Sequence, residues 1–161
     1  MRGQGFLTGI MFALVLSCSL ECFGWPEEEL EINCEVLDQF YTLWSESRYG
    51  EDPTLEKSAW VIRDSDGDNE LMHWPSTRKW RMEVWKGSIP DNVIAQAHTH
   101  PVKTDPRPSA KDHIFSRSVN APLYTVSRKG IWMVTPDGTV QKVAGSNWHI
   151  NLYQATCRAF R

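Results

Sequence analysis

A short apolar run that leads directly into two histidines most constrains how this chain can fold. Residues Val93 to Ala97 have the composition of a buried β-strand, and His98 and His100 follow at once. Side chains at positions i and i+2 of a strand point the same way, so both imidazoles can face one point. Further along, Ser109 has the features of a helix N-cap, and Ala110 to Ser118 are expected to form a short helix. The sequence therefore predicts a strand, a polar loop and a helix around one site.

Asp112 lies one turn into the predicted helix and adds a carboxylate to the two imidazoles. Two nitrogen ligands and one oxygen ligand leave the fourth position of a tetrahedral zinc ion open, which is the arrangement of catalytic rather than structural zinc sites. Ser109 precedes Asp112 by one helical turn, and its hydroxyl can donate a hydrogen bond to an oxyanion. Zn2+ is therefore the expected cofactor, with His98, His100 and Asp112 as its ligands.

The residues His98-Thr-His100-Pro101, then a loop, then Ser109-Ala-Lys-Asp112 resemble the JAMM motif, which is also called the MPN+ motif. Members of this family are zinc-dependent hydrolases, best known as isopeptidases that cut ubiquitin-like modifiers, and bacterial JAB-type relatives occur in other settings. The resemblance implies that the two histidines and the aspartate bind zinc and that Ser109 supports the tetrahedral intermediate. It also implies a cytidine-deaminase-like architecture in which helices flank a central sheet.

The family also uses a glutamate at the start of an early strand as its general acid and base. Glu56 is our match for this glutamate, because it directly precedes the predicted strand Ser58 to Arg63. Glu51 is a weaker candidate because it lies too far from that strand, and Glu70 is weaker because it lies on the wrong side of the following hairpin. The resemblance extends from about Leu55 to Val143, so it leaves the first predicted helix and the cysteines outside the motif.

The amino terminus has the layout of a secretory signal peptide. A basic residue precedes an apolar run from Phe6 to Leu16, which is too short to span a bilayer as a helix. Small residues permit cleavage after Gly24, so we expect residues 1–24 to be the signal peptide and residues 25–161 to form one domain. Lipidation at Cys18 is an alternative, because the residues before it loosely resemble a bacterial lipobox. The expected location is therefore secreted or periplasmic, with a membrane anchor only if Cys18 is lipidated.

Removal of the signal peptide would leave two cysteines, Cys34 and Cys157. An even number of cysteines in an oxidising compartment favours a disulfide, which we expect to join these two residues. Closing so long a loop contributes roughly 4 kcal/mol to stability in the chain-entropy model. Lipidation at Cys18 would instead leave Cys22 unpaired or force another pairing.

The remaining pattern predicts a mixed α and β fold with a mostly antiparallel central sheet and helices packed on it. An amphipathic helix is expected from about Glu27 to Glu46, because apolar residues recur there at helical spacing. The acidic segment Asp64 to Asn69 is expected to be a hairpin turn, since it lacks the glycine position and the final glutamate of an EF-hand loop. The other expected elements are strands at Ser58–Arg63, Glu70–Trp74, Trp80–Trp85, Val93–Ala97, Leu123–Val126, Ile131–Thr135 and Thr139–Val143, and a final helix at Asn147–Phe160.

These features together predict an exported zinc peptidase that hydrolyses a peptide or isopeptide bond in a peptide or protein substrate. An exported enzyme is a poor match for ubiquitin-like substrates, so cell-wall peptides or an exported protein are the better candidates. Nucleic acid is not an expected partner, because a chain of net charge -3 shows no clustered basic face. Two alternatives stay open: a catalytically silent JAMM-like binding module, and a domain in which zinc is a structural staple.

Overall fold

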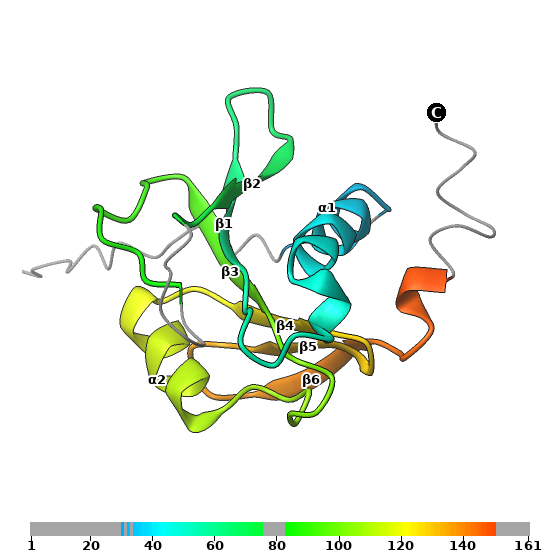
Figure 1. The fold of residues 1–161 in the computed structure, drawn as a ribbon. Coiled ribbons are helices and arrows are strands. Elements are labelled where there is room, and N and C mark those ends of the chain that lie inside the picture. The colour runs from blue at the N-terminus through cyan, green and yellow to red at the C-terminus, as the bar shows by residue number, and fades with distance from the viewer. Residues whose placement is uncertain (1–29, 31, 33, 76–82, 151–161) are drawn as a thin grey trace, which may run out of the picture.

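A six-stranded sheet forms the centre of the fold (Figure 1). The computed structural model describes residues 30, 32, 34–75 and 83–150. The strands are β1 (Ser58–Arg63), β2 (Asn69–His73), β3 (Val93–Thr99), β4 (Leu123–Ser127), β5 (Gly130–Val134) and β6 (Val140–Ala144). Their order is β2-β1-β3-β4-β5-β6, and each neighbouring pair is antiparallel except β3 with β4. The predicted mixed fold class with a mostly antiparallel sheet is therefore confirmed.

Two α-helices, α1 (Cys34–Glu46) and α2 (Ala110–Val119), lie on different sides of this sheet (Figure 1). A short 3-10 turn, η1 (Arg48–Gly50), follows α1. The helix α2 connects β3 to β4, and a connection between parallel neighbouring strands must cross one face of the sheet. The first turn of α2 lies beside the carboxyl end of β3, and the helix then leads the chain to the start of β4.

The side chains of β1 divide the core into two clusters, one on each face of the sheet. Ala59 and Val61 belong to the larger cluster, which is formed with α1. Trp60 and Ile62 belong to a second cluster, against which Phe115 of α2 packs. This division follows from the two-residue period of a β-strand, which sends successive side chains to opposite faces. We call the two sides the α1 face and the α2 face.

The helix α1 ends at Glu46 as predicted but begins at Cys34 rather than near Glu27. Leu30 and Ile32 are not helical. Leu30 is buried, and Ile32 packs against the cluster on the α1 face. In a non-helical segment, side chains two residues apart can point the same way, so Leu30 and Ile32 can both reach this cluster. Burial of the two side chains is therefore favoured over a helix that starts earlier. Residues 27–29 lie outside the described part of the chain.

The predicted strand Trp80–Trp85 is wrong where it can be checked, because residues 83–85 are not part of any strand. Glu83 is buried in this segment, and its carboxylate accepts a hydrogen bond from the backbone at the start of β1.

The acidic segment after β1 is the predicted hairpin turn, in which the Asp64 carboxylate accepts hydrogen bonds from the backbone N–H groups of Asp66 and Asp68. The other predicted strands are present, and their ends differ from the predicted ones by at most two residues.

Several predictions fall on parts of the chain that the structure does not describe. These are the signal peptide at residues 1–24, the lipidation site Cys18 and the second half-cystine Cys157. Cys34 is disulfide-bonded, and its pairing with Cys157 stays a prediction. Residues 148–150 are helical, as expected for the start of the final helix, and its remaining residues lie outside the described range. Within the described residues, no helix has the length and apolar character that crossing a membrane requires.

Candidate metal centre

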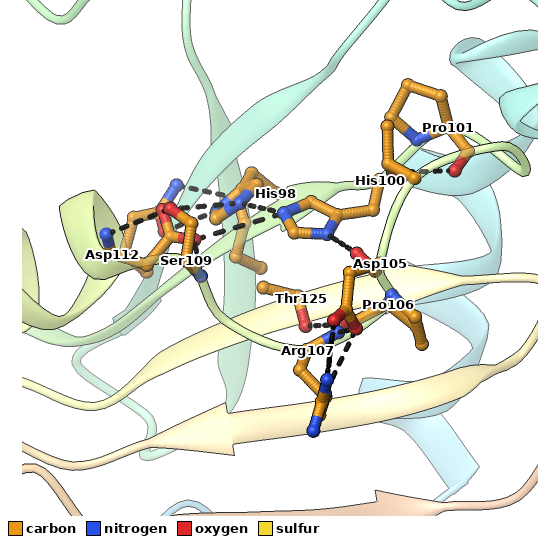
Figure 2. Close-up of polar contacts among 12 residues, drawn as sticks. His98, His100, Pro101, Asp105, Pro106, Arg107, Ser109, Asp112 and Thr125 are labelled. Carbon is orange, nitrogen blue, oxygen red and sulfur yellow. Dashed lines mark hydrogen bonds and ion pairs between the residues drawn. The ribbon is translucent and has the colours of Figure 1, made fainter.

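Three side chains with metal-binding atoms converge at the carboxyl end of β3 (Figure 2). The Nε2 atoms of His98 and His100 lie 3.0 Å apart. Asp112 Oδ1 lies 3.6 Å from His98 Nε2, and Asp112 Oδ2 lies 3.9 Å from His100 Nε2. A tetrahedral zinc ion with bonds of about 2.0 to 2.1 Å separates its ligand atoms by about 3.3 Å, which falls between these distances. The donor set and its spacing therefore fit a zinc ion.

Hydrogen bonds on the far side of each imidazole orient the two rings. Gln96 donates its amide N–H to the Ala97 carbonyl, so its amide oxygen is free to accept from His98 Nδ1 at 3.2 Å. The Asp105 backbone carbonyl accepts from His100 Nδ1 at 2.7 Å. Since a carbonyl oxygen can only accept, both Nδ1 atoms carry a proton, and in the neutral form of each ring the lone pair of Nε2 faces the centre. Such outer hydrogen bonds are typical of metal-binding histidines.

The Asp112 carboxylate is held by the amino terminus of α2. The backbone N–H of Ser109 donates to Asp112 Oδ2 at 2.6 Å, and the Ser109 hydroxyl accepts from the Asp112 N–H at 3.4 Å. This reciprocal pair is a capping box, which confirms the predicted N-cap. The arrangement that starts the helix thus also aims the carboxylate at the imidazoles.

The centre is largely shielded from solvent. The side chains of His98, His100 and Asp112 expose 13%, 12% and 15% of their surface. The pKa of His98 is lowered to about 4, first by burial and then by the neighbouring His100, while the Asp112 carboxylate opposes the shift. His98 is therefore neutral at neutral pH, which is the form of histidine that binds a metal.

The loop that carries the Asp105 carbonyl is braced on two sides. Arg107 hydrogen-bonds the Asp105 carboxylate through its side chain and backbone, which lowers the pKa of that carboxyl to about 2. Thr125 of β4 donates its hydroxyl proton to the Pro106 carbonyl at 2.7 Å (Figure 2). These contacts hold in place the acceptor that orients His100.

Gly50 supports the same loop from the other side. Its carbonyl accepts a hydrogen bond from the Val102 N–H at 2.9 Å. Its φ is +70°, and a Cβ added here would lie 3.1 Å from the His100 carbonyl oxygen. Only glycine adopts this backbone conformation without strain and also leaves room for the loop.

Glu56, the predicted general acid and base, lies on the wall of the same cavity. In the pairing of β1 with β3, Ser58 is opposite His98, and a backbone hydrogen bond continues the pairing past the end of β1. Glu56 directly precedes Lys57, whose carbonyl accepts this hydrogen bond from the Thr99 N–H at 2.9 Å. Glu56, Ser109 and the three ligand residues all line one cavity of about 610 Å³. The structure therefore brings together every site residue that the sequence predicted, apart from the cysteines.

Neither of the two weaker glutamate candidates is among the described residues that line this cavity. Glu51 lies at the surface, where its carboxylate is 3.4 Å from the Arg128 guanidinium. Glu70 lies on the edge strand β2, opposite Ile62 of β1. Among these three glutamates, the geometry favours Glu56.

Glu83 also lines the cavity, and no pattern in the sequence marks it as a site residue. Its side chain is 4% exposed and accepts hydrogen bonds from the Ser58 N–H at 2.7 Å and from the Lys57 ammonium at 3.1 Å. These two partners offset the free-energy cost of burying the Glu83 carboxylate, because a buried carboxylate without a partner is strongly unfavourable. The partners directly follow Glu56, so Glu83 fixes the backbone next to the predicted acid and base.

No protein-family model matches the sequence, and no curated protein matches it.

Proposed function

We propose that this chain is an exported zinc hydrolase of the JAMM type that cleaves an amide bond in a peptide or protein. The observation that best supports the proposal is the convergence of His98, His100 and Asp112 in one cavity with Glu56. A mixed sheet with a helix on each side is compatible with a JAMM-like architecture. The spacing of the four residues resembles the motif of that family.

In this proposal His98, His100 and Asp112 hold zinc, which supplies a Lewis acid that polarises the substrate carbonyl and lowers the pKa of water towards about 7. Glu56 takes a proton from the attacking water and delivers it to the leaving amine. Ser109 donates a hydrogen bond to the carbonyl oxygen as negative charge develops on it. Gln96 and the Asp105 carbonyl keep both imidazoles in the orientation that binds the metal.

The proposed location outside the cytoplasm rests on the signal-peptide pattern in residues 1–24, with lipidation at Cys18 as the alternative. A disulfide at Cys34 is compatible with an oxidising compartment. The substrate class that follows is a cell-wall peptide or an exported protein.

The proposal is tested with Glu56→Gln in the zinc-loaded protein and a mixture of peptides as substrate. We expect turnover, followed by mass spectrometry, to fall by about 10²- to 10⁴-fold while the zinc content stays unchanged. Glu51→Gln is the matched control, because the same change at the surface leaves the cavity intact, and it is expected to keep full turnover. A zinc-loaded wild type that cuts no peptide would contradict the proposal and favour the silent binding module.

A further inference from the structure

An aromatic cluster on the α2 face is not used by the metal centre or the acid–base residues. Trp60 of β1 lies in the middle of this cluster and is fully buried. The ring centroids of Trp74, Phe115 and Trp85 lie 5.1, 5.9 and 6.1 Å from the centroid of Trp60. Trp74 also contacts the other two rings, with centroids 6.1 Å from Trp85 and 6.0 Å from Phe115. The four rings therefore form one continuous aromatic surface.

The three outer rings of this cluster, Trp74, Trp85 and Phe115, line the cavity that contains the metal centre. Phe115 follows Asp112 by about one turn of α2, so the aromatic wall adjoins the ligands directly. A largely apolar cavity with a few convergent polar groups is the usual composition of a binding site for an organic ligand. The cavity thus has a reactive end and an apolar end.

The aromatic wall is held in position by contacts outside the cluster. Glu83 binds the Ser58 N–H and the Lys57 ammonium, which attaches the segment 83–85 to the start of β1. The Trp85 indole N–H donates to the Ser88 carbonyl at 3.0 Å, which orients that ring. A surface fixed in this way loses little conformational entropy when a ligand binds.

We infer that the aromatic wall is a specificity subsite for a large, uncharged, apolar side chain next to the amide bond that is cut. This inference rests on the proposed function, because the cavity joins the wall to the residues that would act on that bond. A side chain of this kind gains by leaving water for the rings of Trp74, Trp85 and Phe115. A carboxylate side chain would lose its hydration among these rings without gaining a hydrogen-bond partner from them, which disfavours an acidic residue at this position.

The test compares short alanine-serine peptides that differ only in one central residue: Phe, Leu, Ala or Asp. We expect kcat/KM of the wild type to be about 10- to 100-fold higher for the Phe and Leu peptides than for the Ala peptide, and lowest for the Asp peptide. In Trp85→Ala the preference for Phe over Ala should shrink to about threefold or less. Trp85→Leu keeps an apolar side chain if the alanine variant does not fold, and it should reduce the preference less. Trp132→Ala, on β5 and outside the cavity lining, is the matched control and should keep the preference.

A binding measurement separates failure of this inference from failure of the proposed function. Calorimetric titration of zinc-loaded Glu56→Gln with the same peptides should show the same preference for Phe and Leu in Kd, whether or not any peptide is cut. Tighter binding of the Phe peptide without turnover in the wild type would support the subsite and contradict the hydrolase. Equal Kd and equal kcat/KM for the Phe and Ala peptides, or a preference that survives Trp85→Ala, would overturn the subsite.

Discussion

The two faces of the sheet are built from alternate residues of the same strands, yet they differ in composition. The α1 face packs Val61 and Phe40 into an apolar cluster, and Phe40 contacts Tyr124 at a centroid distance of 5.5 Å. The α2 face carries Gln96 and His98 of β3 beside the aromatic wall, around an open cavity. The α1 face thus carries the larger buried apolar cluster, which allows the α2 face to keep polar ligands and an apolar cavity.

The largest effect on stability is expected from Phe40→Ala on the α1 face. Phe40 is 0% exposed, so its truncation removes apolar contacts and leaves a cavity that costs about 3 to 5 kcal/mol in the free energy of unfolding. Urea denaturation measures this loss. Ile114→Ala is the control, because Ile114 is 70% exposed on α2 and its truncation should cost little. Equal losses for the two variants would contradict the assignment of the main core to the α1 face.

The next effect is expected from Gln96→Leu on the α2 face. This change removes the amide that accepts from His98 Nδ1, so the ring loses the hydrogen bond that orients it. Loss of such an outer contact typically weakens metal binding by about 10- to 100-fold. Competition with a zinc-binding dye measures the affinity, and Gln141→Leu on the exposed edge strand β6 serves as the matched control. Unchanged zinc affinity in Gln96→Leu would show that the rings are oriented by other means.

A further effect is expected from pH on the metal-free protein. Burial lowers the pKa of His98 from 6.5 to about 4, so between these pH values the unfolded chain binds the proton and the folded chain does not. The free energy of unfolding should therefore fall as pH falls through this window. Denaturation in the presence of a chelator measures this, and His98→Gln should flatten the dependence whereas His113→Gln should not. An equal slope in wild type and His98→Gln would contradict the shift.

The smallest effect is expected from removal of metal by a chelator. The cluster on the α1 face does not include the metal ligands, so the metal-free chain should keep its fold. We expect far-UV circular dichroism to be retained at 25 °C and thermal unfolding to remain cooperative, with a lower Tm because a ligand of the folded state has been removed. Loss of the circular dichroism signal on chelation would favour the structural-staple alternative.

Local patterns made much of the fold and the centre predictable from the sequence. The two-residue period of β3 gives His98 and His100 a common direction, and Ser109 with Asp112 has the spacing of a capping box. Glu56 was predictable only through the resemblance to a known motif. Its place in the same cavity as His100 depends on the pairing of β1 with β3, two strands that are distant in the sequence.

The rest of the site depends on long-range contacts that leave no local pattern. Glu83 looks like an isolated surface charge in the sequence, and only the partners Lys57 and Ser58 explain its burial. Trp85 lies in a segment whose alternation resembles a strand, although its ring packs on Trp60 in an irregular loop. Side-chain pairing and aromatic packing override strand propensity at these positions.

Zinc stoichiometry of the purified chain decides whether the α2 face holds a metal centre. After zinc loading and removal of excess metal, we expect about one zinc per chain in the wild type and in His113→Ala, and none in His98→Ala or Asp112→Ala. A folded wild type that retains no zinc, or variants that retain as much as the wild type, would contradict it.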